Sequence, residues 1–134
     1  MATIFTKIIN QEIPSYRIAE SDEFYAFLDI SPLTNGHTLV VTKVEVDYLF
    51  DVEDDVLGRM LVFSKKVAKA IELVVDCERV GVAVIGLEVP HAHIHLIPIN
   101  GMDDMNFANP KLNLSQEEFS EIAENINTTF ESLT

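Results

Sequence analysis

The chain has 134 residues, of which 48% are hydrophobic, and its formal net charge is −13. This length fits one globular domain with a real core. The acidic balance argues against nucleic acid or an anionic membrane surface as partners, because both require clustered Lys and Arg. Cys77 is the only cysteine, the N-terminus lacks the pattern of a signal peptide, and no apolar run approaches the ~20 residues of a membrane span. We expect a soluble protein of the reducing cytoplasm.

The first 41 residues predict a short helix followed by three strands. The apolar spacing indicates an amphipathic helix within 3–12 and strands over 16–19, 24–28 and 37–41. The dipeptide Asn35-Gly36 is a strong turn signal and stands directly before the third strand. His37 is therefore expected at the start of a strand.

The remainder of the chain predicts two more helices and two more strands. These are a long amphipathic helix ending near Val74, a strand over 80–85, a histidine-rich strand, and a final helix headed by a capping box at Ser115 and Glu118. Because residues 80–85 are apolar without interruption, we expect a buried central strand beside the histidine strand. The connection 99–114 is long but carries several apolar residues, which indicates that it docks on the protein.

The stretch from Pro90 to Pro98 contains three of the four histidines, at every second position. Side chains on a strand alternate between faces. His91, His93 and His95 are therefore expected on one face, and the apolar residues between them on the other. This pattern predicts a row of imidazoles on a rigid element backed by the core.

Three uses of such a row remain open from the residues alone. A His-x-His pair can bind zinc or iron, with His37 or a carboxylate completing the site. A neutral imidazole can also attack phosphorus while its neighbours stabilise the developing charge. A purely structural role is the least favoured, because charged imidazoles on one face repel. By themselves, His37 and Asp29 have ordinary explanations, as a residue beside a turn and as a turn initiator.

The segment His91-Ala92-His93-Ile94-His95-Leu96-Ile97 resembles the signature His-φ-His-φ-His-φ-φ of the histidine triad (HIT) nucleotide hydrolases and transferases, where φ is apolar. Further segments resemble N-terminal blocks of that family, in the family's order. They are residues 4–9, 12–14, 26–32 and 36–41. The resemblance to HIT-like proteins, which include bacterial ones, covers most of residues 3–98.

The resemblance implies an α+β fold, with an antiparallel sheet of about five strands, one long helix packed on it, and a C-terminal helix. We expect a single HIT domain over residues 1–134, in which 99–134 form a C-terminal loop-helix extension. Members usually form a homodimer whose sheets continue across the interface. No cofactor and no metal are expected for the reaction.

The resemblance also implies roles for individual residues. His93 would be the nucleophile that attacks the α-phosphorus, and His95 and His37 would hydrogen-bond the phosphate oxygens. His91 would orient the site or the leaving group, and Asp29 would hold the ribose hydroxyls. The remaining expected nucleotide-binding residues are Phe5, Ile8, Phe27, Ile30, Glu88 and Val89, with the first four around the base.

The resemblance implies hydrolysis of nucleoside phosphoramidates, or related nucleotide conjugates, through a nucleotidyl-histidine intermediate. Purine nucleotides are the expected ligands. Two alternatives are a dinucleoside polyphosphate hydrolase and a non-catalytic nucleotide-binding or regulatory dimer.

Two departures from the family pattern bear on these expectations. Leu87 and Glu88 stand in the loop before the triad, with Leu87 at a position that commonly holds Gln. The Glu88 carboxylate would repel an anionic leaving group and favour an amine. In addition, Thr6 and Glu45 stand where some bacterial members carry ligands of a structural zinc, so we predict no zinc.

Overall fold

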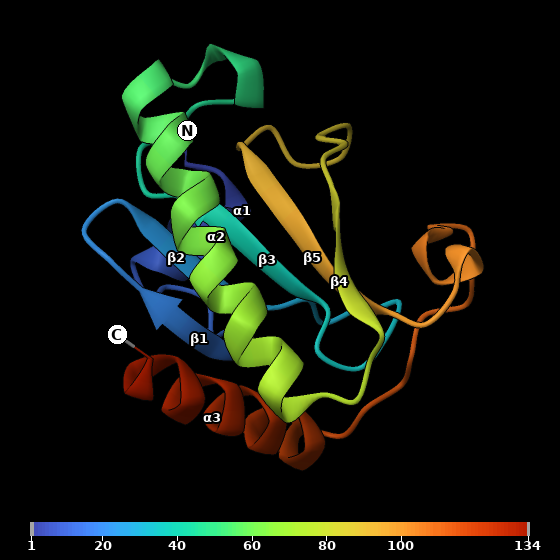
Figure 1. The fold of residues 1–134 in the computed structure, drawn as a ribbon. Helices are drawn as coiled ribbons and strands as arrows, with labels where there is room; N and C mark the ends of the chain where they lie inside the picture. Colours follow the sequence, from blue (N-terminus) through green and yellow to red (C-terminus); the bar gives the residue numbers. More distant parts are fainter. Residues whose placement is uncertain (1, 134) are drawn as a thin grey trace.

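The computed structural model describes residues 2–133 as a five-stranded antiparallel sheet with three α-helices (Figure 1). In chain order the elements are α1 (Ile4–Ile9), β1 (Arg17–Glu20), β2 (Phe24–Leu28), β3 (Thr38–Thr42), α2 (Asp54–Val74), β4 (Arg79–Ala83), β5 (His93–Ile99) and α3 (Gln116–Ser132). Two short 3₁₀ helices, η1 (Leu49–Asp51) and η2 (Met102–Met105), lie in the connections. The predicted fold class is confirmed.

The strands lie in the order β1-β2-β3-β5-β4, and every neighbouring pair is antiparallel. The histidine strand β5 is therefore flanked on both sides. In the register with β3, His93 lies opposite Val41 and His95 lies opposite Leu39. His95 therefore lies in the ladders of both neighbouring strands, and His93 lies in the ladder with β3.

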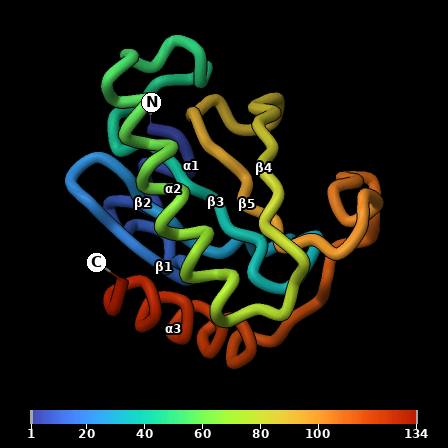
Figure 2. The backbone as a smooth tube through the Cα atoms, in the orientation of Figure 1, coloured from blue at the N-terminus to red at the C-terminus, as the bar shows by residue number. Residues whose placement is uncertain are grey.

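The main core lies on the face of the sheet that α2 and α3 cover. Figure 1 shows α2 crossing the front of the sheet, and Figure 2 shows α3 passing beside its lower end. Ala92, Ile94 and Leu96 of the histidine segment belong to this core, together with Ile71 of α2 and Ile126 of α3. The predicted alternation along β5 is confirmed on this side.

The opposite face of the sheet carries a second, smaller cluster under α1. Its buried members are Phe5, Ile8, Tyr25, Phe27, Leu39 and Val41. In Figure 1 the short helix α1 lies behind the sheet, on the side away from α2. This second cluster borders the histidine side chains.

The prediction of a buried central strand over residues 80–85 is wrong. That segment forms β4, which ends at Ala83, pairs only with β5, and lies at the edge of the sheet. Val82 is 54% exposed, and Val84 and Ile85 are exposed as well. An uninterrupted apolar run is common to a central strand and to an edge strand with an apolar surface, so the pattern could not separate them.

The connection over residues 99–114 docks on the sheet, as its apolar content indicated. The Met105 sulfur lies 2.8 Å from the position that a Cβ on Gly81 would take, so Met105 packs directly on the backbone of β4. Further along, the Leu112 amide donates to the Pro32 carbonyl at 2.9 Å. The connection therefore closes back onto the loop before His37.

The C-terminal helix begins at the predicted capping box. The Glu118 amide donates to the Ser115 hydroxyl, and the Ser115 amide donates to the Glu118 carboxylate.

Within residues 2–133, the structure has no helix whose length and apolar character would suit a membrane crossing.

Candidate active site

The four histidines come together at one place although His37 is distant from the others in sequence. The turn at Asn35-Gly36 delivers His37 to the start of β3, and Gly36 adopts a φ of +87°, which favours glycine. The ring centroids of His93 and His95 lie 5.1 Å apart, and those of His37 and His95 lie 5.2 Å apart. His37 therefore lies beside the triad, as predicted.

A backbone amide determines which nitrogen of His37 carries the proton. The Leu33 amide donates to Nδ1 of His37 at 3.0 Å, so Nδ1 must present its lone pair. In a neutral ring the proton then lies on Nε2, which donates to Nδ1 of His95 at 2.9 Å. The proton of neutral His95 must accordingly lie on its Nε2.

Two backbone carbonyls determine the tautomers of His91 and His93 in the same manner. Nε2 of His91 donates to the Thr42 carbonyl at 2.6 Å, and Nδ1 of His93 donates to the His91 carbonyl at 2.6 Å. A carbonyl can only accept, so both of these nitrogens carry protons. Neutral His93 is left with a lone pair on Nε2.

These tautomers give the site a nucleophile and a donor side by side. Within residues 2–133, Nε2 of His93 and Nε2 of His95 have no hydrogen-bond partner, and neither atom is fully buried. Nε2 of His93 presents a lone pair, and Nε2 of His95 presents an N–H. This combination can attack an electrophilic phosphorus and donate to one of its oxygens.

Burial keeps the imidazoles of His37, His93 and His95 neutral near pH 7. It lowers the pKa of His37 to about 3, with help from His95 and Lys111, and lowers the pKa of His95 to about 4, with help from His93. Burial is also the largest cause of the lowered pKa of His93. A lowered pKa leaves the His93 lone pair available at neutral pH.

Asp29 follows β2 and lies beside His37. One carboxylate oxygen accepts from the Ser31 amide at 2.8 Å, and the other lies 3.6 Å from Nε2 of His37. Burial is the main cause that raises the pKa of Asp29, and the charge of Glu88 adds to this rise. Glu88 is therefore close enough to act on the same site electrostatically.

The expected base-binding residues divide into two groups. Phe5, Ile8 and Phe27 are buried in the smaller cluster, against which Val89 packs. Ile30 is 70% exposed. The first group forms a preformed apolar wall, while Ile30 offers free apolar surface.

The structure does not favour a metal ion at the histidines. Ligand atoms of Asp29, His37 and His95 lie within 4.8 Å of one another, which is compatible with a metal by distance alone. A metal at Nε2 of His37 would need the lone pair of that nitrogen, but the Leu33 amide assigns it the proton.

A structural zinc does not fit the residues around Thr6 and Glu45 either. The Thr6 hydroxyl donates to the Glu45 carboxylate at 2.6 Å, and threonine hydroxyls are not among the ligands that zinc prefers. The predicted absence of metal stays a prediction.

Two residues that contact the histidines were not identified from the sequence. The Thr3 hydroxyl lies 2.6 Å from Nδ1 of His91. The Phe107 ring meets the rings of His95 and His37 edge to face, with centroids 5.1 and 6.3 Å apart. The only sign of either was that Phe107 is one of the apolar residues in the connection that was expected to dock.

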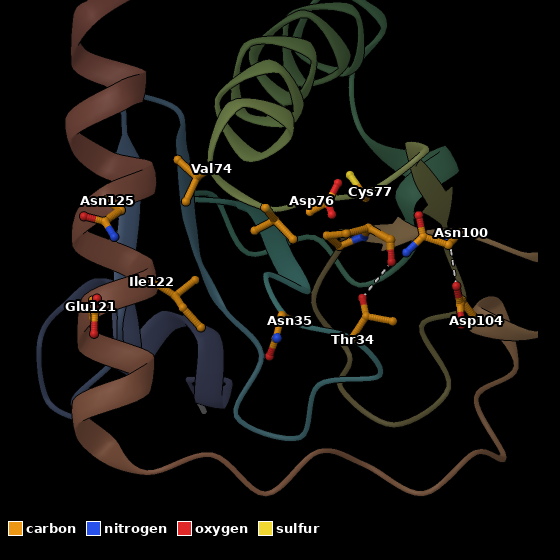
Figure 3. A pocket seen from close by; sticks show the side chains of 12 residues that line it. Thr34, Asn35, Val74, Asp76, Cys77, Asn100, Asp104, Glu121, Ile122 and Asn125 are labelled. Atoms are coloured by element: carbon orange, nitrogen blue, oxygen red, sulfur yellow. Dashed lines mark hydrogen bonds between the residues drawn. The ribbon is translucent and has the colours of Figure 1, made fainter.

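A separate hollow of about 460 Å³ lies between α3 and the end of α2 (Figure 3). None of the four histidines lines it. Asp76, Asp104 and Glu121 do line it, and its wall contains no Lys or Arg. The three carboxylates make it a poor place for a phosphate, so the site at the histidines is the candidate active site.

This fold and this constellation of histidines define a class of protein. The family model of the HIT domain matches residues 10–102, which include all four histidines and Asp29. The chain belongs to the HIT family and is an enzyme of that family.

Similar proteins come from distant organisms. An uncharacterized HIT-like protein of Borreliella burgdorferi is 40% identical over 128 residues, covering 90% of this chain and 92% of that protein. An adenosine 5′-monophosphoramidase of Saccharomyces cerevisiae is 41% identical over 100 residues, covering 72% of this chain and 62% of that protein. The crystal structure of a HIT-like protein from Bartonella henselae, described as involved in cell-cycle regulation, superposes with a TM-score of 0.81 at 30% identity and covers 95% of each chain.

Proposed function

We propose that this enzyme hydrolyses nucleoside phosphoramidates, or related nucleotide conjugates, through a nucleotidyl-histidine intermediate on His93. The observation that carries the proposal is the pair of tautomers at β5, which places a lone pair on Nε2 of His93 beside an N–H on Nε2 of His95. The similarity to an adenosine 5′-monophosphoramidase supports a purine nucleotide as the substrate.

In the proposed first step, Nε2 of His93 attacks the α-phosphorus. A bond forms between nitrogen and phosphorus, and the bond to the leaving amine breaks, with the amine taking the bonding electrons and a proton from solvent water, which is returned to solvent when water cleaves the intermediate. Nε2–H of His95 donates to a phosphate oxygen as negative charge develops there. Water then cleaves the nucleotidyl-histidine, which releases the nucleoside monophosphate and restores the imidazole.

The geometry favours a positioning role for His37 and His91. Both ring nitrogens of His37 are engaged, with the Leu33 amide and with His95, so it orients His95 and does not reach a phosphate oxygen itself. Both ring nitrogens of His91 are likewise engaged, and its carbonyl orients His93. This revises the direct phosphate contact expected of His37.

The other residues of the site contact the ribose, the base and the leaving group of the substrate. Asp29 accepts from the ribose hydroxyls through a carboxylate that is only partly buried. The base lies against the apolar wall that contains Phe5 and Phe27, with Ile30 closing over it. Glu88 and Val89 line the side of the leaving group. No cofactor takes part.

We also propose a homodimer that acts in the cytoplasm. β4 is an edge strand with exposed Val82, and the segment that follows it exposes Val84, Ile85 and Leu87. An apolar edge of this kind invites pairing with a second copy of the chain.

The alternative functions rest on the loop before the triad. Leu87 is exposed and Glu88 adds negative charge near Asp29. Either alternative function, hydrolysis of a dinucleoside polyphosphate or nucleotide binding without catalysis, would result from the altered residues of this loop.

The test uses the purified protein with an adenosine phosphoramidate, beside His93→Ala. We expect the wild type to release amine and adenosine monophosphate, and the variant to lose at least ~10³-fold in kcat, because its nucleophile is absent. Rapid quenching followed by mass spectrometry should find the adenylyl group on His93 in the wild type.

Binding of adenosine monophosphate, measured by calorimetry, is the control for folding of the variant. Turnover by His93→Ala at the wild-type rate would contradict the proposal. Binding of the monophosphate by a wild type that hydrolyses neither the phosphoramidate nor a dinucleoside polyphosphate would favour the regulatory dimer instead.

A further inference from the structure

The start of α1 carries a hydrogen-bonded cluster that reaches the triad. The Thr3 amide and the Thr6 hydroxyl both donate to Oε1 of Glu45, at 2.7 and 2.6 Å. The Thr6 amide donates to the Thr3 hydroxyl oxygen at 3.1 Å, which makes Thr3 the N-cap of the helix. The same hydroxyl lies 2.6 Å from Nδ1 of His91. Thr3 therefore joins the helix, Glu45 and the histidine segment.

The direction of the contact between Thr3 and His91 follows from its surroundings. Nε2 of His91 carries a proton because it faces the Thr42 carbonyl. In the neutral ring, Nδ1 is then an acceptor, and the single hydroxyl hydrogen of Thr3 must point to it. The other acceptor for that hydrogen, the Thr6 hydroxyl, is farther away at 3.3 Å.

His91 is held at both ends of its ring and has no exposed surface. Its carbonyl accepts from Nδ1–H of His93 at 2.6 Å, and this bond leaves the lone pair of His93 on Nε2. Phe5, also on α1, packs edge to face on both rings, with centroids 5.7 Å from His91 and 5.0 Å from His93. A loss of the Thr3 hydroxyl leaves Nδ1 of His91 buried without a partner, which favours a rotated ring.

We propose that Thr3 is a positioning residue of the reaction: its hydroxyl holds the His91 ring at Nδ1, and because the His91 carbonyl accepts from Nδ1–H of His93, this anchor also orients the His93 ring. The inference rests on the proposed function of His93 and adds to it a residue of the N-terminal helix that touches neither substrate nor phosphorus. The Glu45 carboxylate holds Thr3 in place by accepting a hydrogen bond from the Thr3 backbone amide.

The experiment compares Thr3→Val, which keeps the shape and loses the hydroxyl, with Thr3→Ser, which keeps the hydroxyl. Thr6→Val is the matched control, because it removes a hydroxyl from the same helix and the same carboxylate without touching His91. Each variant is assayed for kcat and KM on the adenosine phosphoramidate, and the imidazole nitrogens are assigned by ¹⁵N NMR in the absence of substrate.

We expect Thr3→Val to lower kcat by about 10- to 100-fold with KM changed less than about threefold, which is the range for loss of a group that orients a reactive histidine. The ¹⁵N shifts of both His91 and His93 should move. Thr3→Ser should restore both readouts to within about threefold of the wild type, and Thr6→Val should leave them near the wild type.

Thr3→Val with wild-type kcat and wild-type ¹⁵N shifts would overturn the inference. A lower melting temperature with kcat unchanged would also overturn it, since Thr3 would then only cap the helix. If the wild type itself fails to hydrolyse any substrate, the proposed function fails, and the NMR comparison still decides separately whether Thr3 positions the two rings.

Discussion

At the scale of single residues, three backbone groups determine the chemistry of four histidines. The Leu33 amide acts on His37, and the carbonyls of Thr42 and His91 act on His91 and His93. Backbone groups cannot exchange their donor and acceptor roles, so the tautomers they impose do not change with pH while the rings stay neutral. The site is therefore preorganised before any substrate arrives.

Phe107 provides a prediction about water access. Its ring covers the imidazoles of His95 and His37, so Phe107→Ala should hydrate them and raise the pKa of His95 from about 4 toward its ordinary value. A proton NMR titration of the His95 ring measures this. Phe50→Ala, which alters an exposed ring elsewhere, should leave the pKa unchanged. An unaltered pKa in Phe107→Ala would mean that other groups exclude the water.

Glu88 provides a prediction about substrate choice. Its carboxylate raises the pKa of Asp29 and would repel an anionic leaving group. Glu88→Gln should therefore improve kcat/KM for a dinucleoside polyphosphate relative to a phosphoramidate, by about three- to tenfold, and lower the pKa of Asp29. Glu12→Gln, which removes a carboxylate at another exposed position, is the control. Equal selectivity in wild type and Glu88→Gln would eliminate the charge effect.

At the scale of elements, β4 is the exposed edge through which the proposed dimer would pair. Lysine on an edge strand blocks pairing between edges, so Val82→Lys should shift the protein from dimer to monomer in analytical ultracentrifugation. Phe50→Lys places the same charge on another exposed apolar residue and should leave the dimer intact. A wild type that sediments as a monomer would contradict the proposed dimer, as would a Val82→Lys variant that remains dimeric.

At the scale of the whole molecule, the buried histidines couple stability to pH. The pKa values of His37 and His95 are about 3 and about 4 in the folded protein, below their ordinary value of 6.5. Between pH 6.5 and about pH 4 the unfolded chain therefore binds more protons, and acidification destabilises the fold. Each of the two histidines contributes a slope that approaches about 1.4 kcal/mol per pH unit.

Urea unfolding from pH 7.5 to pH 4.5 measures this dependence. We expect the free energy of unfolding to be nearly constant above pH 7 and to fall below pH 6.5. His37→Asn should reduce the slope by about 1.4 kcal/mol per pH unit, whatever its effect on absolute stability. The raised pKa of Asp29 acts in the opposite direction as that carboxyl takes up its proton. A stability that does not change between pH 6.5 and pH 4.5 would contradict the neutral burial of both rings.

The sequence by itself determined which segments form elements and, for β5, α2 and α3, which faces they bury. The alternation from His91 to Leu96, the helical spacing up to Val74 and the capping box at Ser115 all report local geometry, and the structure agrees with each of them. The HIT signature also identified the histidines as a group. These features are encoded within a few residues of one another, so periodicity is sufficient to find them.

Only the tertiary structure decided where protons lie and which strand stands at the edge. The contact between Thr3 and His91 joins positions 88 residues apart, and the contact between His37 and His95 spans 58 residues. The edge position of β4 depends on which strands pair with β5, and the apolar residues of β4 do not determine how many strands pair with it. Hydrogen-bond direction and strand order arise from the packing of distant segments, and local patterns in the chain do not contain them.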